Sequence, residues 1–340
     1  MFSGFDGGLV GSWIDRARPL NRHILLAEGE EPRVLRAAEL ATKLGLCRLS
    51  VLGSRSQIER IAVEQRISLD GIEVIEIANH PLFDALANDY SQMRQRETGK
   101  ALPPQIAASL ISNPLYFAAL LASRGVVDGI VAGAVNTTAS VLRVARLIIG
   151  PRQSDMDISS CFVLDGLPSH LGNDGVIGLA DCAVITNPTS SQLANIAIAT
   201  ASTMELLVPG CSPRVALLSF STHGSSVHSS VDEITRAVAL IREKSSLLVD
   251  GELQVDAALI PAVAEVKAPE SALHGRANIL VFPDLNSANI GYKLMQYAGG
   301  ARSYGPIFQG LRYPMNDLSR GATPAEIVGV IACSCLQSQS

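Results

Sequence analysis

The stretch Val126-Val-Asp-Gly-Ile-Val-Ala-Gly-Ala-Val-Asn-Thr-Thr138 places a short apolar run directly before a loop of glycine, asparagine and threonine. The run at 126–132 predicts a buried β-strand, and the apolar spacing beyond the loop predicts a helix. In open α/β sheets, ligands lie outside the carboxyl ends of strands, near the N-termini of the following helices. The loop 133–138 therefore either offers N–H and hydroxyl groups to an anion or is a turn capped by Thr137 or Thr138.

The same alternation extends to both sides of this stretch. Strands are expected at 23–27, 47–52, 71–77, 160–164, 176–185, 215–219, 247–250 and 277–282. Helices are expected at 34–44, 116–123, 139–149, 190–207 and 231–243, with Thr189 or Ser190 capping the longest. Strands that alternate with helices predict an α/β protein with parallel sheets.

The chain has 340 residues, and this length predicts two domains. Hydrophobic residues make up 47% and charged residues 17%, which is typical of a folded globular protein. Aromatic residues are only 4%, so the core is expected to consist of aliphatic side chains and alanine. The residues 150–155 have the composition of a connection between the domains.

Charge and apolar runs exclude two classes of partner. The 27 Lys and Arg against 32 Asp and Glu give a net charge of −5, which excludes a general nucleic-acid binder. No apolar run approaches the roughly 18 residues of a membrane helix, and residues 1–13 lack a signal-peptide pattern. Six cysteines without a C-x-x-C pair predict buried, reduced thiols. We therefore expect a cytoplasmic protein with neither a nucleic acid nor a membrane as partner.

The strongest local motif lies near the C-terminus, where Ser319-Arg-Gly321 precedes a helix start. Thr323 as N-cap, a proline at the first helical position and Glu326 at the third form a capping box. Arginine offers a planar donor fork for phosphate or carboxylate, and a helix start adds free N–H groups. Ser319 and Arg320 are therefore either part of a phosphate cradle or residues of a solvated loop.

Other polar positions also have two interpretations. Glu326 either caps its helix or acts as a general base, and a base in this role would need a pKa raised by desolvation. The polar clusters at 250–256 and 282–291 follow expected strands, so they either line a binding site or cap turns and helices.

Three familiar motifs are absent from the sequence. It contains no G-x-x-x-x-G-K-[ST] loop, and no G-x-G-x-x-G follows the first expected strand. Neither H-E-x-x-H nor a His/Cys cluster indicates zinc. We therefore expect no P-loop phosphotransferase, no ordinary dinucleotide fold and no zinc site.

Taken together, these segments resemble the phosphate acetyl/butyryl transferase family over nearly the whole chain after the first twenty residues. The matching pieces, in chain order, are residues 26–35, 127–138, 180–184, 215–222, 250–258, 267–269, 282–286, 289–293 and 316–321. Their number and their order make chance similarity improbable.

The resemblance implies reversible transfer of an acetyl group between acetyl phosphate and coenzyme A, with coenzyme A as substrate. It also implies an α/β fold with two α/β/α domains of the isocitrate/isopropylmalate-dehydrogenase-like kind and an interdomain cleft. In that fold the C-terminal segment returns to the first domain, so residues 1–158 with 312–340 form one domain and 159–311 the other. Family members are usually homodimers, and the resemblance implies that the chemistry needs no metal and no prosthetic group.

The resemblance also assigns roles to single residues. Ser319 and Arg320 match the active-site Ser-Arg of the family, in which the arginine binds phosphate or polarises the acetyl carbonyl and the serine steadies the oxyanion. Glu326 stands where relatives commonly carry an aspartate thought to deprotonate the thiol of coenzyme A.

A second group of matched residues is expected to bind substrate. Arg94 resembles the phosphate-contacting arginine of the family, and Arg143 matches another arginine of the cleft. Asn136, Thr137 and Thr138 match the loop that approaches the acyl phosphate.

Three alternatives remain open at this point. A butyryl or other short-chain acyl transferase would differ only in the acyl pocket. A dehydrogenase of the same fold would need a metal-binding carboxylate cluster and a nicotinamide site, which the sequence does not reveal. A non-catalytic acyl-CoA-sensing domain is disfavoured because Ser319 and Arg320 are both present.

Overall fold

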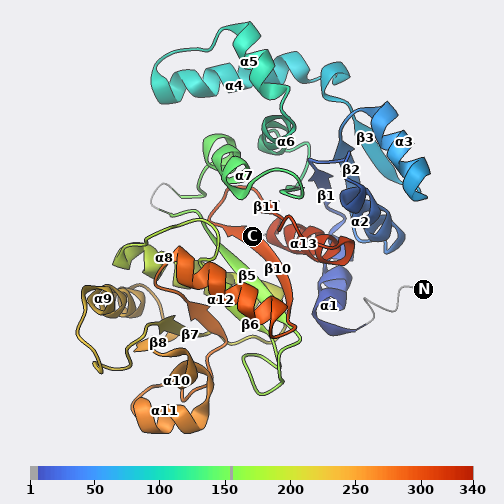
Figure 1. Ribbon diagram of the computed structural model, residues 1–340. Coiled ribbons are helices and arrows are strands. Elements are labelled where there is room, and N and C mark those ends of the chain that lie inside the picture. The colour runs from blue at the N-terminus through green and yellow to red at the C-terminus, as the bar shows by residue number, and fades with distance from the viewer. Residues whose placement is uncertain (1–6, 154–155, 340) are drawn as a thin grey trace. The chain divides into compact units, whose positions relative to one another are not determined.

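The computed structural model describes residues 7–153 and 156–339 of the chain. The chain divides into two compact units, residues 1–152 with 311–340 (unit 1) and residues 153–310 (unit 2). Figure 1 shows the helices and strands of each unit. The expectations for segments 1–13 and 150–155 lie partly outside the described residues.

Unit 1 is built on a five-stranded sheet with the order β11-β4-β1-β2-β3, and all neighbouring strands are parallel. The strands are β1 (His23–Leu26), β2 (Arg48–Leu52), β3 (Ile72–Ile75), β4 (Gly129–Ala132) and β11 (Met315–Asp317). Most of their residues are buried, as expected for parallel strands covered on both faces.

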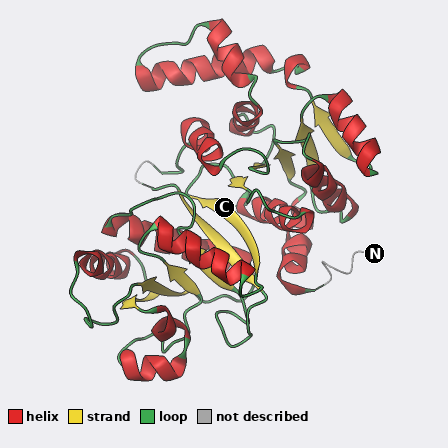
Figure 2. Ribbon diagram, in the orientation of Figure 1, coloured by secondary structure: helices red, strands yellow, loops and turns green. Residues whose placement is uncertain are grey.

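Helices and helical turns accompany this sheet, and the helices of residues 83–111 lie apart from it at the top of the view (Figure 2). They are α1 (Gly8–Ala17), η1 (Arg18–Leu20), α2 (Pro32–Lys43), α3 (Arg55–Gln65), η2 (Ile77–Asn79), α4 (Phe83–Thr98), α5 (Pro104–Ile111), α6 (Pro114–Ser123), α7 (Thr138–Val144), the π-helical η3 (Ala145–Ile149) and α13 (Pro324–Gln337). The last helix, α13, packs against α1, α2 and the strands β1, β4 and β11. The C-terminal segment therefore completes the core of unit 1.

Unit 2 contains a six-stranded sheet with the order β10-β5-β6-β9-β7-β8. Its strands are β5 (Ser159–Asp165), β6 (Ile177–Ala180), β7 (Arg214–Leu218), β8 (Leu248–Leu253), β9 (Ile279–Val281) and β10 (Arg302–Gln309). Its helices are α8 (Ser190–Leu207), α9 (Ser229–Lys244), α10 (Val255–Leu259), α11 (Pro261–Lys267) and α12 (Leu285–Tyr297). The β5 strand is antiparallel to β10 and β6, so the expectation of purely parallel sheets is wrong for unit 2.

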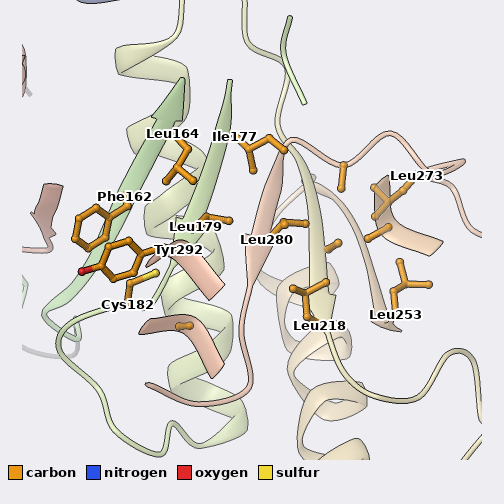
Figure 3. Packing of buried hydrophobic residues seen from close by; sticks show 14 of the residues in the cluster. Phe162, Leu164, Ile177, Leu179, Cys182, Leu218, Leu253, Leu273, Leu280 and Tyr292 are labelled. Carbon is orange, nitrogen blue, oxygen red and sulfur yellow. The ribbon is translucent and has the colours of Figure 1, made fainter. Parts of the chain in front are cut away.

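The β6 strand shows how helices cover both faces of this sheet. Ile177 and Leu179 join the buried cluster in Figure 3, in which the rings of Phe162 and Tyr292 stack at 4.2 Å between centroids. Gly178, between them, points the other way, because an added Cβ there would lie 2.8 Å from the sulfur of Met204 on α8. Since alternate strand residues face opposite sides, α8 and α12 lie on opposite faces of the sheet.

Two further expectations need correction. The strand expected at 176–185 ends at Ala180, because the carboxylate of Asp181 accepts the backbone N–H groups of residues 183–185 and folds them into a turn. The six cysteines are free thiols, but Cys47 and Cys211 are only half-buried instead of buried.

Among the described residues, no single helix is both long and apolar enough to cross a membrane, although the bent pair of α5 and α6 passes that test when taken together.

Candidate active site

Three loops of unit 1 meet at one edge of its sheet. The parallel neighbours β1, β4 and β11 are followed by the β1 loop (residues 27–31), the β4 loop (133–137) and the β11 loop (318–323), which lead into α2, α7 and α13. The strand order runs from β1 to β2 and β3 on one side and to β4 and β11 on the other. The carboxyl ends of β1 and β4 therefore flank the switch point of the sheet, where α/β proteins bind ligands.

Glu28 in the β1 loop orders the β4 loop. The residue is 9% exposed, and its Oε2 accepts the N–H of Ala134 at 2.6 Å. Its Oε1 accepts the N–H groups of Val135 at 3.2 Å and Asn136 at 2.8 Å, and the Asn136 amide at 2.7 Å. An ionised carboxylate makes strong hydrogen bonds as an acceptor. The backbone of the β4 loop is thus wrapped around Glu28, and the amide nitrogen of Asn136 is committed to it.

Arg33, in the first turn of α2, joins all three loops. Its Nη1 donates to the carbonyl oxygens of Arg320 at 2.7 Å and Ala322 at 3.2 Å. Its Nη2 donates to the carbonyl oxygen of Ala134 at 3.1 Å, and its Nε donates to Glu31 at 2.7 Å. The planar guanidinium therefore fixes the β11 loop beside the β4 loop.

The β11 loop turns tightly at Ser319 and Arg320. The N–H of Ala322 donates to the carbonyl oxygen of Ser319 at 2.8 Å, and the N–H of Gly321 donates to the Ser319 hydroxyl at 3.4 Å. The Arg320 side chain is exposed and makes no hydrogen bond or ion pair with any described residue. Its backbone is held by Arg33 while its guanidinium is available to an anion.

Thr137 and Thr138 have different partners although they are adjacent. Thr137 is the N-cap of α7, and its hydroxyl accepts the N–H of Ser140 at 3.2 Å. The Thr138 hydroxyl donates to Oδ2 of Asp317 at 2.5 Å, which links the β4 loop to the end of β11. The capped-turn interpretation is confirmed for Thr137, whereas Thr138 contacts a buried acid.

Asp317 is fully buried and has an unusual pKa. Burial raises its pKa to about 7, and the charge of Glu28 also raises it. The hydrogen bond from Thr138, the N–H of Leu318 and the charge of Arg320 act in the opposite direction. A carboxyl group that titrates near neutral pH therefore lies beside the three loops.

Glu326 is a capping residue in this structure. Its Oε2 accepts the N–H of Thr323 at 2.7 Å and the Thr323 hydroxyl at 3.0 Å, while the Glu326 N–H donates back at 3.3 Å. The expected capping box at the start of α13 is confirmed. Its role as a base stays a prediction.

The two remaining predicted arginines are not joined to this cluster by any contact found among the described residues. Arg94 lies on α4, and its Nη1 pairs with Glu97 of the same helix at 3.0 Å. Arg143 is exposed in α7, which begins directly after the β4 loop. Of the predicted residues, Asn136, Thr138, Ser319 and Arg320 belong to the network held by Glu28, Arg33 and Asp317.

Glu28, Arg33 and Asp317 were not selected from the sequence as site residues. Glu28 and Arg33 lie in the matching piece 26–35, and Asp317 lies in the matching piece 316–321. The family resemblance therefore includes their segments, but it does not reveal the contacts of their side chains. Within the described residues, no group of three or more His, Cys, Asp or Glu side chains could hold a metal ion.

The fold and these loops define a class of protein, a doubly wound α/β protein whose switch point carries arginine and carboxylate side chains. The model of the family described as "Phosphate acetyl/butaryl transferase" matches residues 10–335. The phosphate acetyltransferase of Thermoanaerobacterium thermosaccharolyticum is 40% identical over 97% of this chain and 99% of its own length. The chain therefore belongs to the phosphate acetyl/butyryl transferase family, and it is an acyltransferase.

Solved structures agree with this assignment. A phosphotransacetylase from Streptococcus pyogenes is similar with a TM-score of 0.88 and 33% identity, covering 97% of this chain and 98% of that one. The 4-hydroxythreonine-4-phosphate dehydrogenase from Klebsiella pneumoniae, at 15% identity, has a TM-score of 0.53 over 94% of this chain and 100% of its own. The second likeness concerns the fold alone, and it fits the expected dehydrogenase-like architecture.

Proposed function

We propose that this chain transfers an acetyl group reversibly between acetyl phosphate and coenzyme A by direct attack of the thiol. The sulfur forms a bond to the acetyl carbon while the bond from that carbon to the phosphate oxygen breaks. Phosphate leaves as an anion, and the thiol proton passes to a base. The observation that carries the proposal is the Arg320 guanidinium. It forms no hydrogen bond or ion pair with a described residue, and it lies beside a loop edge rich in polar groups.

Arg320 and Ser319 are proposed to stabilise the charge that develops during transfer. Arg320 would bind the departing phosphate or polarise the carbonyl, and the Ser319 hydroxyl would steady the oxyanion. A preorganised donor of this kind typically contributes about 2.7–4 kcal/mol to transition-state stabilisation. Arg33 supports this role because it fixes the backbone of Arg320.

Substrate binding is proposed for five residues. Arg94 would contact phosphate, Arg143 would bind substrate as another arginine of the cleft, and Asn136, Thr137 and Thr138 would approach the acyl phosphate. The ordering of the β4 loop by Glu28 supports the last three residues.

Glu326 is proposed as the base that accepts the thiol proton. A thiol with a pKa near 8.5 is a few per cent thiolate at pH 7, so a base adds a modest factor. In the structure the cap uses Oε2, which accepts both the N–H and the hydroxyl of Thr323.

The proposal needs coenzyme A as a substrate and no prosthetic group or metal. We also propose a cytoplasmic homodimer, and we propose residues 1–158 with 312–340 and 159–311 as its two domains. The free cysteines support a reducing compartment, and the grouping of contacts into two units supports the domain division.

Arsenolysis of acetyl-CoA by the purified protein tests this function. Arsenate replaces phosphate, and the acetyl arsenate formed hydrolyses, so free thiol should appear only when protein and arsenate are both present. A parallel assay with butyryl-CoA distinguishes the acetyl preference from a butyryl preference. If neither acetyl-CoA nor butyryl-CoA releases thiol, the proposal is overturned.

A further inference from the structure

Asp317 combines complete burial with an unsatisfied oxygen. Its exposure is 0%, and among the described residues no donor reaches its Oδ1 with hydrogen-bond geometry, although the neighbouring N–H of Leu318 lowers the pKa of the acid. That oxygen lies against the β4 loop, because a Cβ added to Gly133 would lie 1.9 Å from it. The other oxygen, Oδ2, accepts the Thr138 hydroxyl proton at 2.5 Å. A buried polar atom without a partner is unfavourable and calls for a functional explanation.

The chemistry of a hydroxyl group limits what Thr138 can do in this arrangement. A threonine hydroxyl has one proton to donate, and an ionised carboxylate can only accept. While Asp317 is ionised, the Thr138 proton points inward, and the hydroxyl presents only lone pairs to an anion. When Asp317 is neutral, its own O–H can donate to the Thr138 oxygen, which frees the Thr138 proton to point outward.

We propose that Asp317 is a positioning residue that sets the direction in which Thr138 donates its proton, and so decides whether Thr138 can hydrogen-bond an acyl-phosphate oxygen. This inference rests on the proposed function, in which Thr138 faces the acyl phosphate. The neutral acid is the binding-competent form. An anionic substrate beside the pair favours that form, so substrate binding takes up a proton.

The groups that face Asp317 fit such a switch. Thr138, the N–H of Leu318 and Arg320 favour the ionised acid, whereas burial and the charge of Glu28 favour the neutral acid. The resulting pKa of about 7 lets both forms exist at neutral pH. Gly133 has a φ of +104° and leaves no room for a side chain next to Asp317, so the loop packs directly on the acid.

The pH dependence of substrate binding tests the proposal. In Asp317→Asn the amide nitrogen donates to Thr138 at every pH, which fixes the neutral arrangement. The KM for acetyl phosphate at pH 8.5, divided by its value at pH 6, should be about tenfold larger in the wild type than in the variant. This factor corresponds to one hydrogen bond to a charged group. Taking the ratio cancels the ionisation of the substrate, and kcat should change less than KM.

Two variants of Thr138 provide the matched controls. Thr138→Ser keeps the hydroxyl and should keep the wild-type pH profile of KM. Thr138→Val should lose that pH profile, and adding Asp317→Asn to Thr138→Val should change the profile no further. Equal pH profiles of wild type and Asp317→Asn, in chains that still turn over acetyl phosphate, would overturn the role of Asp317 alone. Absence of turnover in the wild type would overturn the proposed function together with it.

Proton uptake gives a second measurement on the unaltered site. Calorimetry of inorganic phosphate binding near pH 7, in buffers of different ionisation enthalpy, should show more proton uptake in the wild type than in Thr138→Val. Equal uptake in both would contradict the proposal even if Asp317→Asn does not fold.

Discussion

Two buried carboxyl groups of unit 1, Glu28 and Asp317, differ in how fully their oxygens are hydrogen-bonded. Glu28 accepts four hydrogen bonds from the β4 loop. Asp317 accepts one side-chain hydrogen bond and keeps one oxygen without a partner among the described residues. Glu28 therefore orders the β4 loop, whereas Asp317 fits a titrating group, because hydrogen bonds stabilise the ionised form of an acid and one of its oxygens lacks them.

Glu28→Gln is expected to loosen the β4 loop. One carboxylate oxygen becomes an amide nitrogen that faces backbone N–H donors, so at least one buried hydrogen bond is lost. The free energy of unfolding in urea should fall by roughly 2–3 kcal/mol, and kcat/KM should fall as well. Glu64→Gln, on the exposed end of α3, should stay within about 0.5 kcal/mol. Equal free energies of unfolding for Glu28→Gln and Glu64→Gln would contradict the role of Glu28 in ordering the β4 loop.

The raised pKa of Asp317 also makes stability depend on pH. Between the usual aspartate pKa of about 3.9 and the native value of about 7, the folded chain binds more protons than the unfolded chain. This contribution to the free energy of unfolding is complete below pH 4 and is lost as the pH rises through 7. The stability of Asp317→Asn does not fall in this way. The free energy of unfolding of the variant, relative to that of the wild type, should therefore increase by roughly 3 kcal/mol from pH 5 to pH 8. If the free energy of unfolding depends on pH in the same way in both chains, the pKa of Asp317 is not raised and the prediction is contradicted.

Among the secondary-structure elements, α13 contains in its first turn a residue, Glu326, that is both part of a helix cap and a proposed catalytic base. Its capping box ties Glu326 to Thr323, and ten of its residues are buried. The cap orients the helix whose N-terminus follows Arg320, so a change at Glu326 has both structural and chemical consequences.

Glu326→Gln separates these consequences, because glutamine still completes a capping box but cannot accept the thiol proton. If Glu326 is only a cap, stability and the pH–rate profile should both match the wild type. If it is the base, kcat should fall and the profile should lose its acidic limb. Thr323→Ala is the matched control, with an expected loss of about 1 kcal/mol of stability from the cap itself.

Local sequence signals predicted some elements well and others poorly. The α13 helix begins directly after the expected cap Thr323, and α8 begins directly after Thr189, one of the two expected caps, because a cap is formed by residues adjacent in sequence. The three-residue β11 strand was not expected, since its pairing with β4 depends on a partner far away in the chain. The early end of β6 depends on the Asp181 side chain, which periodicity does not reveal.

In the whole molecule, residues far apart in sequence build the site. Glu28 and Asn136 are 108 positions apart, Thr138 and Asp317 179, and Arg33 and Arg320 287. The resemblance identified the segments because they are motifs, but only the sheet order brings β1, β4 and β11 together. Contacts between loops of this separation cannot be inferred from spacing alone.

The return of the C-terminus predicts the effect of truncation. Deleting residues 311–340 removes β11 and α13, and with them an edge of the sheet and a buried helix of unit 1. We expect this chain to lose all activity and the cooperative unfolding transition of unit 1 in calorimetry. Deleting only 338–340, beyond the end of α13, should leave the transition unchanged. A truncated chain with normal unfolding would contradict the role of α13 in the core.

The turnover of Arg320→Ala tests the central claim most directly, because the mechanism depends on a guanidinium at the β11 loop. The rate of acetyl-CoA formation at saturating acetyl phosphate and coenzyme A should fall by about 100-fold or more, with an unchanged circular dichroism spectrum. Arg60→Ala, which replaces an exposed arginine of α3, should keep the wild-type rate. A folded Arg320→Ala chain that turns over within a few-fold of the wild type would contradict the account.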